Sequence, residues 1–129
     1  QTEMIKGQSG GTIRLRNSLL LRDVTISYAA ICSEGVITLG GNAANEPCSV
    51  SGTPLGPDHF NRTDLEWRAA IIDRGGFLPV IETRGASPNI DIGVSEGAPL
   101  HDQRGLGYMR SRDGDGDGIS EPDAGAYER

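Results

Sequence analysis

The residues best suited to chemistry lie near the end of the chain, where aspartates alternate with glycines. Asp113, Asp115 and Asp117 are each followed by a glycine, and Gly118 is the last of these. The pattern matches the first half of a looped calcium site, in which alternate carboxylates converge on one ion and a glycine permits the sharp turn. The spacing therefore predicts calcium binding. The alternative is a mobile acidic tail.

The second half of the same template is less regular. The Ile119 carbonyl takes the seventh place and Glu121 the ninth, but Ala124 stands at the twelfth, where a bidentate glutamate normally closes the shell. Asp123, one place earlier, is the candidate substitute. We therefore expect irregular geometry and an affinity suited to calcium-rich extracellular fluid. The predicted ligands are Asp113, Asp115, Asp117, the Ile119 carbonyl, Glu121 and Asp123.

The histidines do not predict catalysis. His59 and His101 each stand beside an aspartate, but adjacent residues on an extended chain point to opposite faces, and no G-x-S-x-G nucleophile motif is present. Carboxylates and arginines could also line a polysaccharide-cleaving cleft, although no spacing in the chain requires it. We therefore predict no catalytic residues. The candidates for such a cleft are Asp64, Asp73 and Asp91 with Arg68, Arg74 or Arg84.

The composition of the 129-residue chain predicts one all-β domain. Apolar residues make up 36% and aromatic residues 5%, so the core must consist of small aliphatic side chains. The 19 glycines and 7 prolines follow no Gly-X-Y period and indicate tight turns between short extended segments. A net charge of −6 disfavours nucleic acid, whose phosphates would be repelled. No apolar run reaches the roughly twenty residues of a membrane span.

Cys32 and Cys48 are the only cysteines. Neither belongs to a C-x-x-C pair or to a histidine cluster that zinc would require. A disulfide between them is therefore predicted, and it would stabilise the fold by roughly 3 kcal/mol in the chain-entropy model. It would also imply an oxidising compartment. The alternative is a pair of buried free thiols.

Short extended runs recur along the chain and no long helix is predicted. The first run alternates apolar and polar residues and bends near Asn17. The run at 64–72 is either a strand or one helical turn. Residues 42–62, rich in Asn, Gly, Pro and Ser, are predicted to form a loop excursion. The predicted strands cover residues 12–21, 24–28, 36–39, 64–72 and 77–83.

The spacing of these strands favours a solenoid, in which each coil contributes to parallel sheets, over a sandwich. Asn17 and Asn42 stand at glycine-bearing or polar bends. They would hydrogen-bond along the stack if they occupied equivalent inside bends of successive coils. The alternative is a pair of solvated turn asparagines.

A set of short segments carries a resemblance to a known family. They are, in order, Arg16 to Leu19, Cys32 through Asn42 to Cys48, Asp73 to Gly76, Ser87 to Gly93, Asp102 to Gly105 and Asp123 to Glu128. Together they resemble the C-terminal region of bacterial right-handed parallel β-helix proteins of the choice-of-anchor Q type, over roughly residues 10 to 129.

The resemblance implies a coil-on-coil fold, a Cys32–Cys48 disulfide, a terminal segment that caps the stack, and a secreted or cell-surface location. It implies no shared catalytic residues. The chain departs from the family in two ways, because its Asp-Gly run at 113–118 is longer and because only a few coils precede it. We predict a short right-handed parallel β-helix (solenoid) with a C-terminal calcium-binding cap. Its parts are an extended segment at 1–11, coils with a disulfide-pinned loop at 12–100 and the cap at 101–129.

An uncovered first coil would expose unpaired strand edges, which soluble proteins normally cover. We therefore expect an extracellular structural subunit that stacks head-to-tail with copies of itself into a filament or surface fibre. The alternative origin of such an end is cleavage of a longer chain. The alternative functions are the C-terminal part of a calcium-dependent polysaccharide-cleaving enzyme, or an adhesin tip that binds surface glycans through Trp67 or Tyr108.

Overall fold

The computed structural model describes residues 5–7, 10–22 and 30–129. Within these ranges the regular structure consists of short β-strands in small sheets, without a helix, so the predicted all-β class is confirmed. Accordingly, none of these ranges holds a helix long and apolar enough to cross a bilayer. The strand predicted at 24–28 and much of the segment at 1–11 lie outside the described residues. The strands are β1 (Ile13–Leu15), β2 (Leu19–Leu20), β3 (Val36–Thr38), β4 (Ala43–Ala44), β5 (Trp67–Ile72) and β6 (Val80–Thr83).

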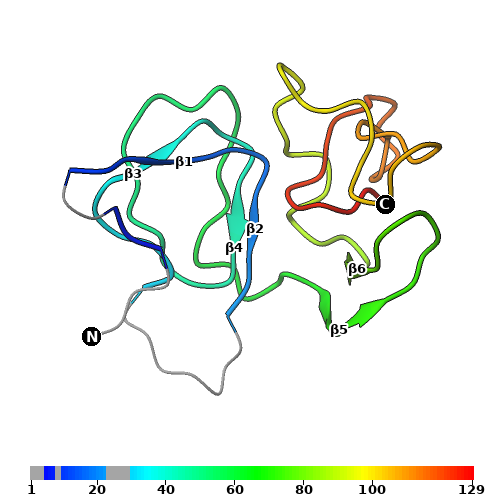
Figure 1. Ribbon diagram of the computed structural model, residues 1–129, viewed down its shortest axis with the longest axis horizontal. Coiled ribbons are helices and arrows are strands. Elements are labelled where there is room, and N and C mark those ends of the chain that lie inside the picture. Colours follow the sequence, from blue (N-terminus) through cyan, green and yellow to red (C-terminus); the bar gives the residue numbers. More distant parts are fainter. Residues whose placement is uncertain (1–4, 8–9, 23–29) are drawn as a thin grey trace.

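The first half of the chain makes three successive passes around a common centre (Figure 1). We define the first pass as residues 5–22, the second as 30–45 and the third as 46–62. β1 pairs in parallel with β3, and β2 with β4. Parallel bridges join Cys32 to both Ile5 and Cys48, and Ala43 to His59. The second pass therefore lies between the first and the third.

The third pass is more ordered than its composition predicts. Residues 42–62 are not a loop excursion, because they contain β4 and parallel bridges at Cys48, Ser51 and His59. Their backbone groups bond to the second pass, as in the 2.8 Å bond from Thr38 N to Ser51 O. The glycines and prolines shorten the paired stretches but do not prevent the pairing.

A core of small aliphatic residues fills the centre of the passes, as the composition predicts. It consists of buried side chains from the first and second passes together with partly buried neighbours from the first and third passes. The Cys32–Cys48 disulfide is present, with 4.6 Å between the two Cα atoms, and it ties the third pass to the second. Burial of each large aliphatic side chain contributes about 1.5–3 kcal/mol. The buried members are Leu15, Ile31, Cys32, Val36 and Ala44.

Asn42 is fully buried and links the three passes. Its Oδ1 accepts from Ser18 N in the first pass at 3.0 Å, and its Nδ2 donates to Asp58 Oδ1 in the third at 2.9 Å. The Asn17 side chain does not bond to a neighbouring pass, because its amide group hydrogen-bonds to the backbone of Val94 in the second half of the chain. The two asparagines therefore do not form the predicted ladder. Asn42 is not a solvated turn residue either, because each of its amide groups has a partner in a neighbouring pass.

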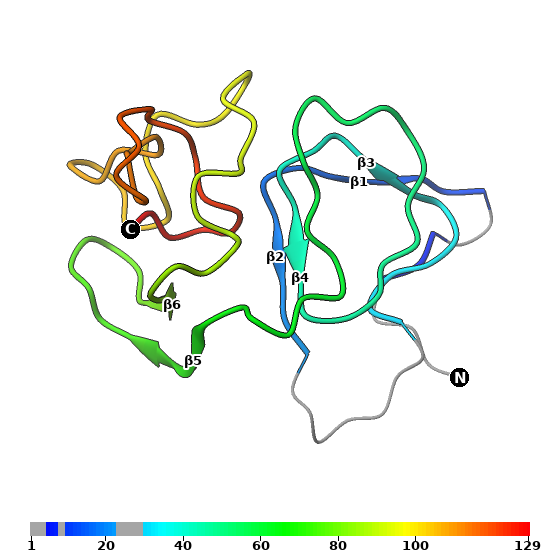
Figure 2. The same cartoon turned by 180° about the vertical axis from the view of Figure 1, so that it is seen from behind.

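The second half of the chain lies beside the passes and leaves their two ends uncovered (Figures 1 and 2). Parallel pairing stops at His59, and β5 and β6 instead form an antiparallel hairpin with an irregularity between Trp67 and Ile71. The two halves approach closely at Gly41, where a Cβ atom would lie 2.8 Å from Gly93 Cα. Residues 84–129 are mostly loops, and they carry the candidate site.

Candidate metal centre

Three aspartates converge in the second half of the protein. One carboxylate oxygen from each of Asp91, Asp113 and Asp115 lies within 4.8 Å of the others. Asp113 and Asp115 belong to the predicted calcium loop, whereas Asp91 comes from a separate loop. We call these three residues the acidic group.

The Asp-Gly loop is folded around its own carboxylates. Asp113 Oδ1 accepts from Gly116 N at 2.6 Å, and Oδ2 accepts from Gly118 N at 3.0 Å. Asp115 and Asp117 each accept from the backbone N–H two residues ahead. Gly118 has φ of 90°, a left-handed conformation that favours glycine. The first aspartate and the glycine of the motif are therefore joined directly, as the sharp turn of the template requires.

Asp91 holds the loop from outside. Its Oδ2 accepts from Gly114 N at 2.8 Å and from Asp115 N at 2.7 Å. Its backbone is left-handed, with φ of 54°, and its N–H donates to Asp123 Oδ1 at 3.0 Å. The remaining oxygen, Oδ1, is buried without a hydrogen-bond partner. A buried carboxylate oxygen of this kind is costly unless a cation or another donor reaches it.

The electrostatics of the acidic group favour a cation. The pKa of Asp91 is raised, chiefly by burial, and the negative charges of Asp115 and Asp113 raise it further against the two backbone hydrogen bonds. Three convergent carboxylates repel one another, and an ion with two positive charges would remove that repulsion. Because all the donors are oxygens on a flexible loop, the donor set fits Ca²⁺ better than a softer metal. The residues present therefore fit a calcium ion.

The other predicted ligands lie outside the acidic group. Asp117 Oδ1 accepts from Ile119 N at 2.7 Å, and Glu121 forms an antiparallel bridge with Arg112. Asp123 is 1% exposed, and its two oxygens accept from the backbone N–H groups of Asp91 and Arg129. The structure therefore brings together two of the six predicted ligands and adds Asp91. The template could not identify Asp91, because that residue lies in a separate loop and has no fixed spacing from the motif.

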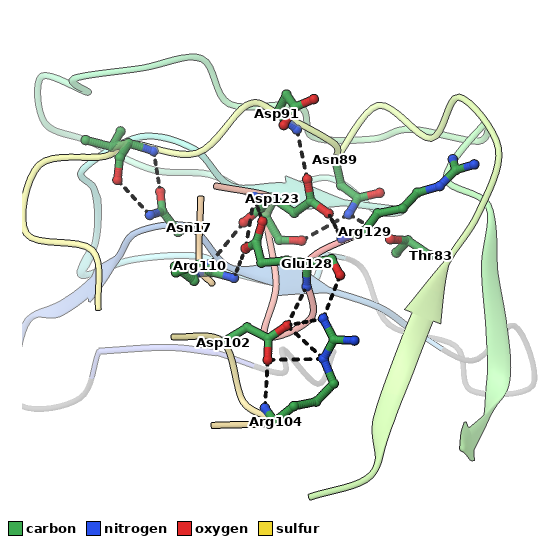
Figure 3. A network of polar contacts seen from close by, with 12 residues as sticks. Asn17, Thr83, Asn89, Asp91, Asp102, Arg104, Arg110, Asp123, Glu128 and Arg129 are labelled. Atoms are coloured by element: carbon green, nitrogen blue, oxygen red, sulfur yellow. Dashed lines mark hydrogen bonds and ion pairs between the residues drawn. The ribbon is translucent and has the colours of Figure 1, made fainter. Parts of the chain in front are cut away.

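Asp123 belongs to a buried polar network that supports Asp91 (Figure 3). The Glu128 carboxylate accepts from Asp123 N and from the Arg110 guanidinium. Arg110 also donates to Asp123 O at 3.0 Å. These three side chains are almost completely buried. The last residues of the chain thus pass through the interior and fix the position of the acidic group.

A second buried ion pair adjoins this network. Asp102 accepts from Arg104 through both oxygens, and it accepts from Glu128 N at 3.0 Å. The Arg104 guanidinium lies between two aromatic rings, 4.2 Å from the centroid of Tyr108 and 4.4 Å from that of Tyr127. Cation–π contacts of this kind contribute roughly 0.5–2 kcal/mol each. The Tyr108 ring therefore packs against the Arg104 guanidinium in this fold.

Burial is the largest single influence on the pKa values of three carboxyl groups in the network, those of Glu128, Asp123 and Asp102. It raises the pKa of Glu128 to about 8, with a further rise from Asp123 and an opposing effect of Arg110. Burial also raises the pKa of Asp123 to about 6. Burial acts in the same direction on Asp102, but hydrogen bonds from Arg104 and from the Glu128 backbone outweigh it, so the pKa of Asp102 is lowered. The network therefore contains two carboxyl groups that titrate near neutral pH.

The residues considered for a polysaccharide-cleaving cleft have separate partners. Asp91 belongs to the acidic group, whereas Arg68, Arg74 and Arg84 all approach Glu82. His59 Nδ1 lies 2.7 Å from Pro88 O. Trp67 packs against the core formed by Ala43, Leu65, Ile92 and Ala124.

Comparison of the chain with family models, with curated proteins and with solved structures gave no match. The resemblance to the choice-of-anchor Q proteins therefore stays a prediction. The features of the structure that bear on function are the parallel passes, the disulfide and the acidic group.

Proposed function

We propose that the protein is a non-catalytic extracellular structural subunit, a short calcium-stabilised β-solenoid that stacks with copies of itself. The three parallel passes are its coils. The disulfide is consistent with an oxidising compartment, and the acidic group suits the high calcium concentration outside cells.

The observation that carries the proposal is the open edge of the first pass. Ile13 N donates to Gly35 O at 2.9 Å, and Leu15 O accepts from Leu39 N at 2.8 Å. Successive residues of a strand direct their backbone groups to opposite sides, so the N–H and C=O of Arg14 point away from the second pass. Within the described residues β1 and β2 have a partner strand on one side only.

A second copy has the backbone groups to cover this edge. Its third pass also pairs on one side only within the described chain, through bridges to the second pass. A head-to-tail contact between these two unlike ends repeats without closing and generates a filament. Charge complementarity is modest, because residues 5–22 contain four basic and no acidic residues, residues 46–62 contain two acidic residues and one arginine, and Arg22 already pairs with Glu46. The four basic residues are Lys6, Arg14, Arg16 and Arg22.

Substitution of Arg14 by proline tests the stacking. Proline removes one backbone N–H, and at position 14 that group points outward, where proline is tolerated on an edge strand. We expect the Arg14→Pro protein to stay folded but to lose assembly at concentrations at which the native protein forms particles larger than a monomer. Analytical ultracentrifugation with calcium and electron microscopy measure the assembly, and thermal denaturation reports the fold.

Two variants serve as controls. Arg14→Ala removes the charge but keeps the N–H group, so it should still assemble, with a weaker dependence on salt. Ile13→Pro removes an N–H that bonds inside the protein and should lower the melting temperature. A native protein that remains monomeric at every concentration and calcium level would contradict the proposal.

A further inference from the structure

Three Asp-Gly pairs follow one another in the loop at 113–118. An aspartate followed by glycine can rearrange without an enzyme, because glycine has no Cβ atom to keep its backbone nitrogen away from the preceding carboxyl carbon. The nitrogen attacks that carbon and closes a cyclic succinimide. Water then opens the ring and leaves an isoaspartate, whose main chain runs through the former side chain.

The rearrangement needs no co-reactant other than water. A bond forms between the glycine nitrogen and the aspartate Cγ atom, and one Cγ–O bond breaks. The released oxygen takes the proton of the nitrogen and one proton from solvent, and it leaves as water. Hydrolysis at the former main-chain carbonyl consumes one water molecule and returns one proton, so the product has the same mass as the starting protein.

The Asp113–Gly114 pair is the best protected of the three. Gly114 N donates to Asp91 Oδ2 at 2.8 Å, and a side-chain atom lies 2.8 Å from the place where a Cβ atom on Gly114 would stand. The Asp113 carboxylate is held further along the loop, where it accepts from Gly116 N and Gly118 N. Both the nitrogen and the carboxyl carbon of this pair are therefore fixed away from each other.

The other two pairs hold the carboxyl group over the glycine. Asp115 Oδ1 accepts from Asp117 N at 3.0 Å, and Asp117 Oδ1 accepts from Ile119 N at 2.7 Å. A side-chain oxygen bonded to the N–H two residues ahead brings the carboxyl carbon close to the intervening nitrogen. Around Gly116 and Gly118 no further atom of the described chain lies within 4 Å of a Cβ position, so the peptide has room to rotate.

Asp113 protects these two pairs unequally. Its Oδ1 accepts from Gly116 N at 2.6 Å, whereas its Oδ2 accepts from Gly118 N at 3.0 Å. The shorter bond to a carboxylate is the stronger one, and it keeps the Gly116 nitrogen from turning to another carbon. Asp115 also belongs to the acidic group, whereas Asp117 does not. Gly118 is therefore the glycine whose nitrogen is held least.

We propose that Asp117 is a site of spontaneous isomerisation to isoaspartate, and that hydrogen bonds to Asp91 and Asp113 protect the two preceding Asp-Gly pairs. The product lengthens the main chain by one carbon atom before Gly118. This displaces Gly118 N from Asp113 Oδ2 and opens the sharp turn of the loop. The reaction requires neither stacking nor calcium, so it does not depend on the proposed function.

Peptide mapping of protein stored at neutral pH and body temperature, with a calcium chelator, tests the site. Electron-transfer fragmentation distinguishes isoaspartate from aspartate of equal mass and assigns its position. We expect isoaspartate to accumulate at position 117 several times faster than at 113 or 115. In protein kept unfolded in guanidinium chloride, all three positions should react at similar rates, because the protecting hydrogen bonds are absent.

Matched positions separate the effect of the glycine from that of the turn. Asp73 has the same type of bond, from Gly75 N at 2.8 Å, but Arg74 follows it, so Asp73 should stay unmodified. Asp117→Glu requires a larger ring that closes more slowly, and it should abolish the product at this position. Asp113→Ala removes the acceptor of two glycine nitrogens and should speed isomerisation at positions 115 and 117.

Three results would overturn the proposal. The first is equal isomerisation of all three Asp-Gly pairs in the folded protein, and the second is an earlier product at 113 or 115 than at 117. The third is no product at 117 over a storage time in which the unfolded protein is converted. An Asp113→Ala protein that isomerises no faster at 115 would remove the protective role of Asp113.

Discussion

Asp91 combines three roles in a single residue. It adopts a left-handed backbone, orders the Asp-Gly loop through Oδ2 and leaves Oδ1 buried without a partner. Aspartate tolerates this backbone better than most side chains. The buried oxygen is the strongest local support for the proposal that a cation binds here.

Replacement of Asp91 by asparagine should have opposite effects with and without calcium. Without calcium the variant should be as stable as the native protein or slightly more so, because the repulsion with Asp113 and Asp115 is reduced. With calcium at about one hundred times its dissociation constant, the native protein should gain about 2.7 kcal/mol, and the variant should lose most of that gain. Differential scanning calorimetry with calcium or chelator measures both effects.

Asp117→Asn distinguishes the acidic group from the ligand set that the motif predicts. The amide oxygen of asparagine can still accept from Ile119 N, so the turn is preserved. If Asp117 is not a ligand, its substitution should leave the calcium-dependent stabilisation unchanged. An equal loss in both variants would show that the ion recruits Asp117 as the motif predicts. A calcium-independent melting temperature in the native protein would rule out the centre.

Glu128 should make the folded protein less stable as the pH rises. Its folded-state pKa of about 8 exceeds the usual value of 4.5, so the folded protein binds this proton more tightly than the unfolded chain does. The resulting stability is fully present below pH 4.5 and is lost as the pH rises through 8. Asp123, with a pKa of about 6, adds the same trend at lower pH. Each group changes the free energy of unfolding by at most about 1.4 kcal/mol per pH unit.

In the presence of a chelator, the melting temperature of the native protein should therefore fall between pH 5 and pH 8. Glu128→Gln removes one titrating group, so its melting temperature should fall less steeply over that interval. Circular dichroism melts at several pH values measure the slopes. Parallel slopes for the two proteins would show that Glu128 does not titrate in this range.

At the scale of elements, the turn between β1 and β2 connects the two halves of the protein. Asn17 has φ of 48°, and its amide exchanges two hydrogen bonds with the backbone of Val94, at 2.9 Å and 2.6 Å. Its carbonyl accepts from Gly125 N at 2.9 Å. Asn17 therefore joins the first pass to the loop at Val94 through its side chain and to the segment at Gly125 through its backbone.

Asn17→Ala should destabilise the protein by about 2–4 kcal/mol, because it removes two hydrogen bonds and places alanine in a left-handed conformation. Asn61 supplies the control, since it has φ of 56° and an exposed side chain. Asn61→Ala should cost only about 1–2 kcal/mol for the backbone. Urea denaturation measures both values. Equal losses would mean that the bonds to Val94 contribute nothing.

Local sequence patterns predicted the elements unevenly. Alternating apolar residues located β1, β2 and the bend between them, and the apolar runs located β3, β5 and β6. The third pass was missed because its strands are only bridges, held by the disulfide, by Asn42 and by backbone bonds to a pass that precedes it. Such pairing depends on the neighbouring pass and leaves no periodicity in the segment itself.

At the scale of the whole molecule, the difference between local spacing and tertiary contact also explains which residues of the candidate site the sequence predicted. The motif predicted Asp113 and Asp115 because their spacing is local. Asp91 joins them through tertiary folding, and Asp123 turns inward because Arg129 and Asp91 offer it backbone donors. Composition predicted the all-β class and the small aliphatic core. The lateral position of the second half follows from contacts such as that of Gly41 with Gly93, which no local pattern reveals.

The burial of Asp123 and Glu128 has a consequence for the order of folding during synthesis. The passes at 5–62 contain their own core, and these residues leave the ribosome before the remainder is made. The acidic group cannot reach its final geometry until Asp123 emerges to anchor Asp91 and Glu128 locks Asp123 in place. The proposed calcium site is therefore the last part of a nascent chain to be completed, and a ribosome stalled before residue 123 would hold a chain whose acidic group is not yet anchored.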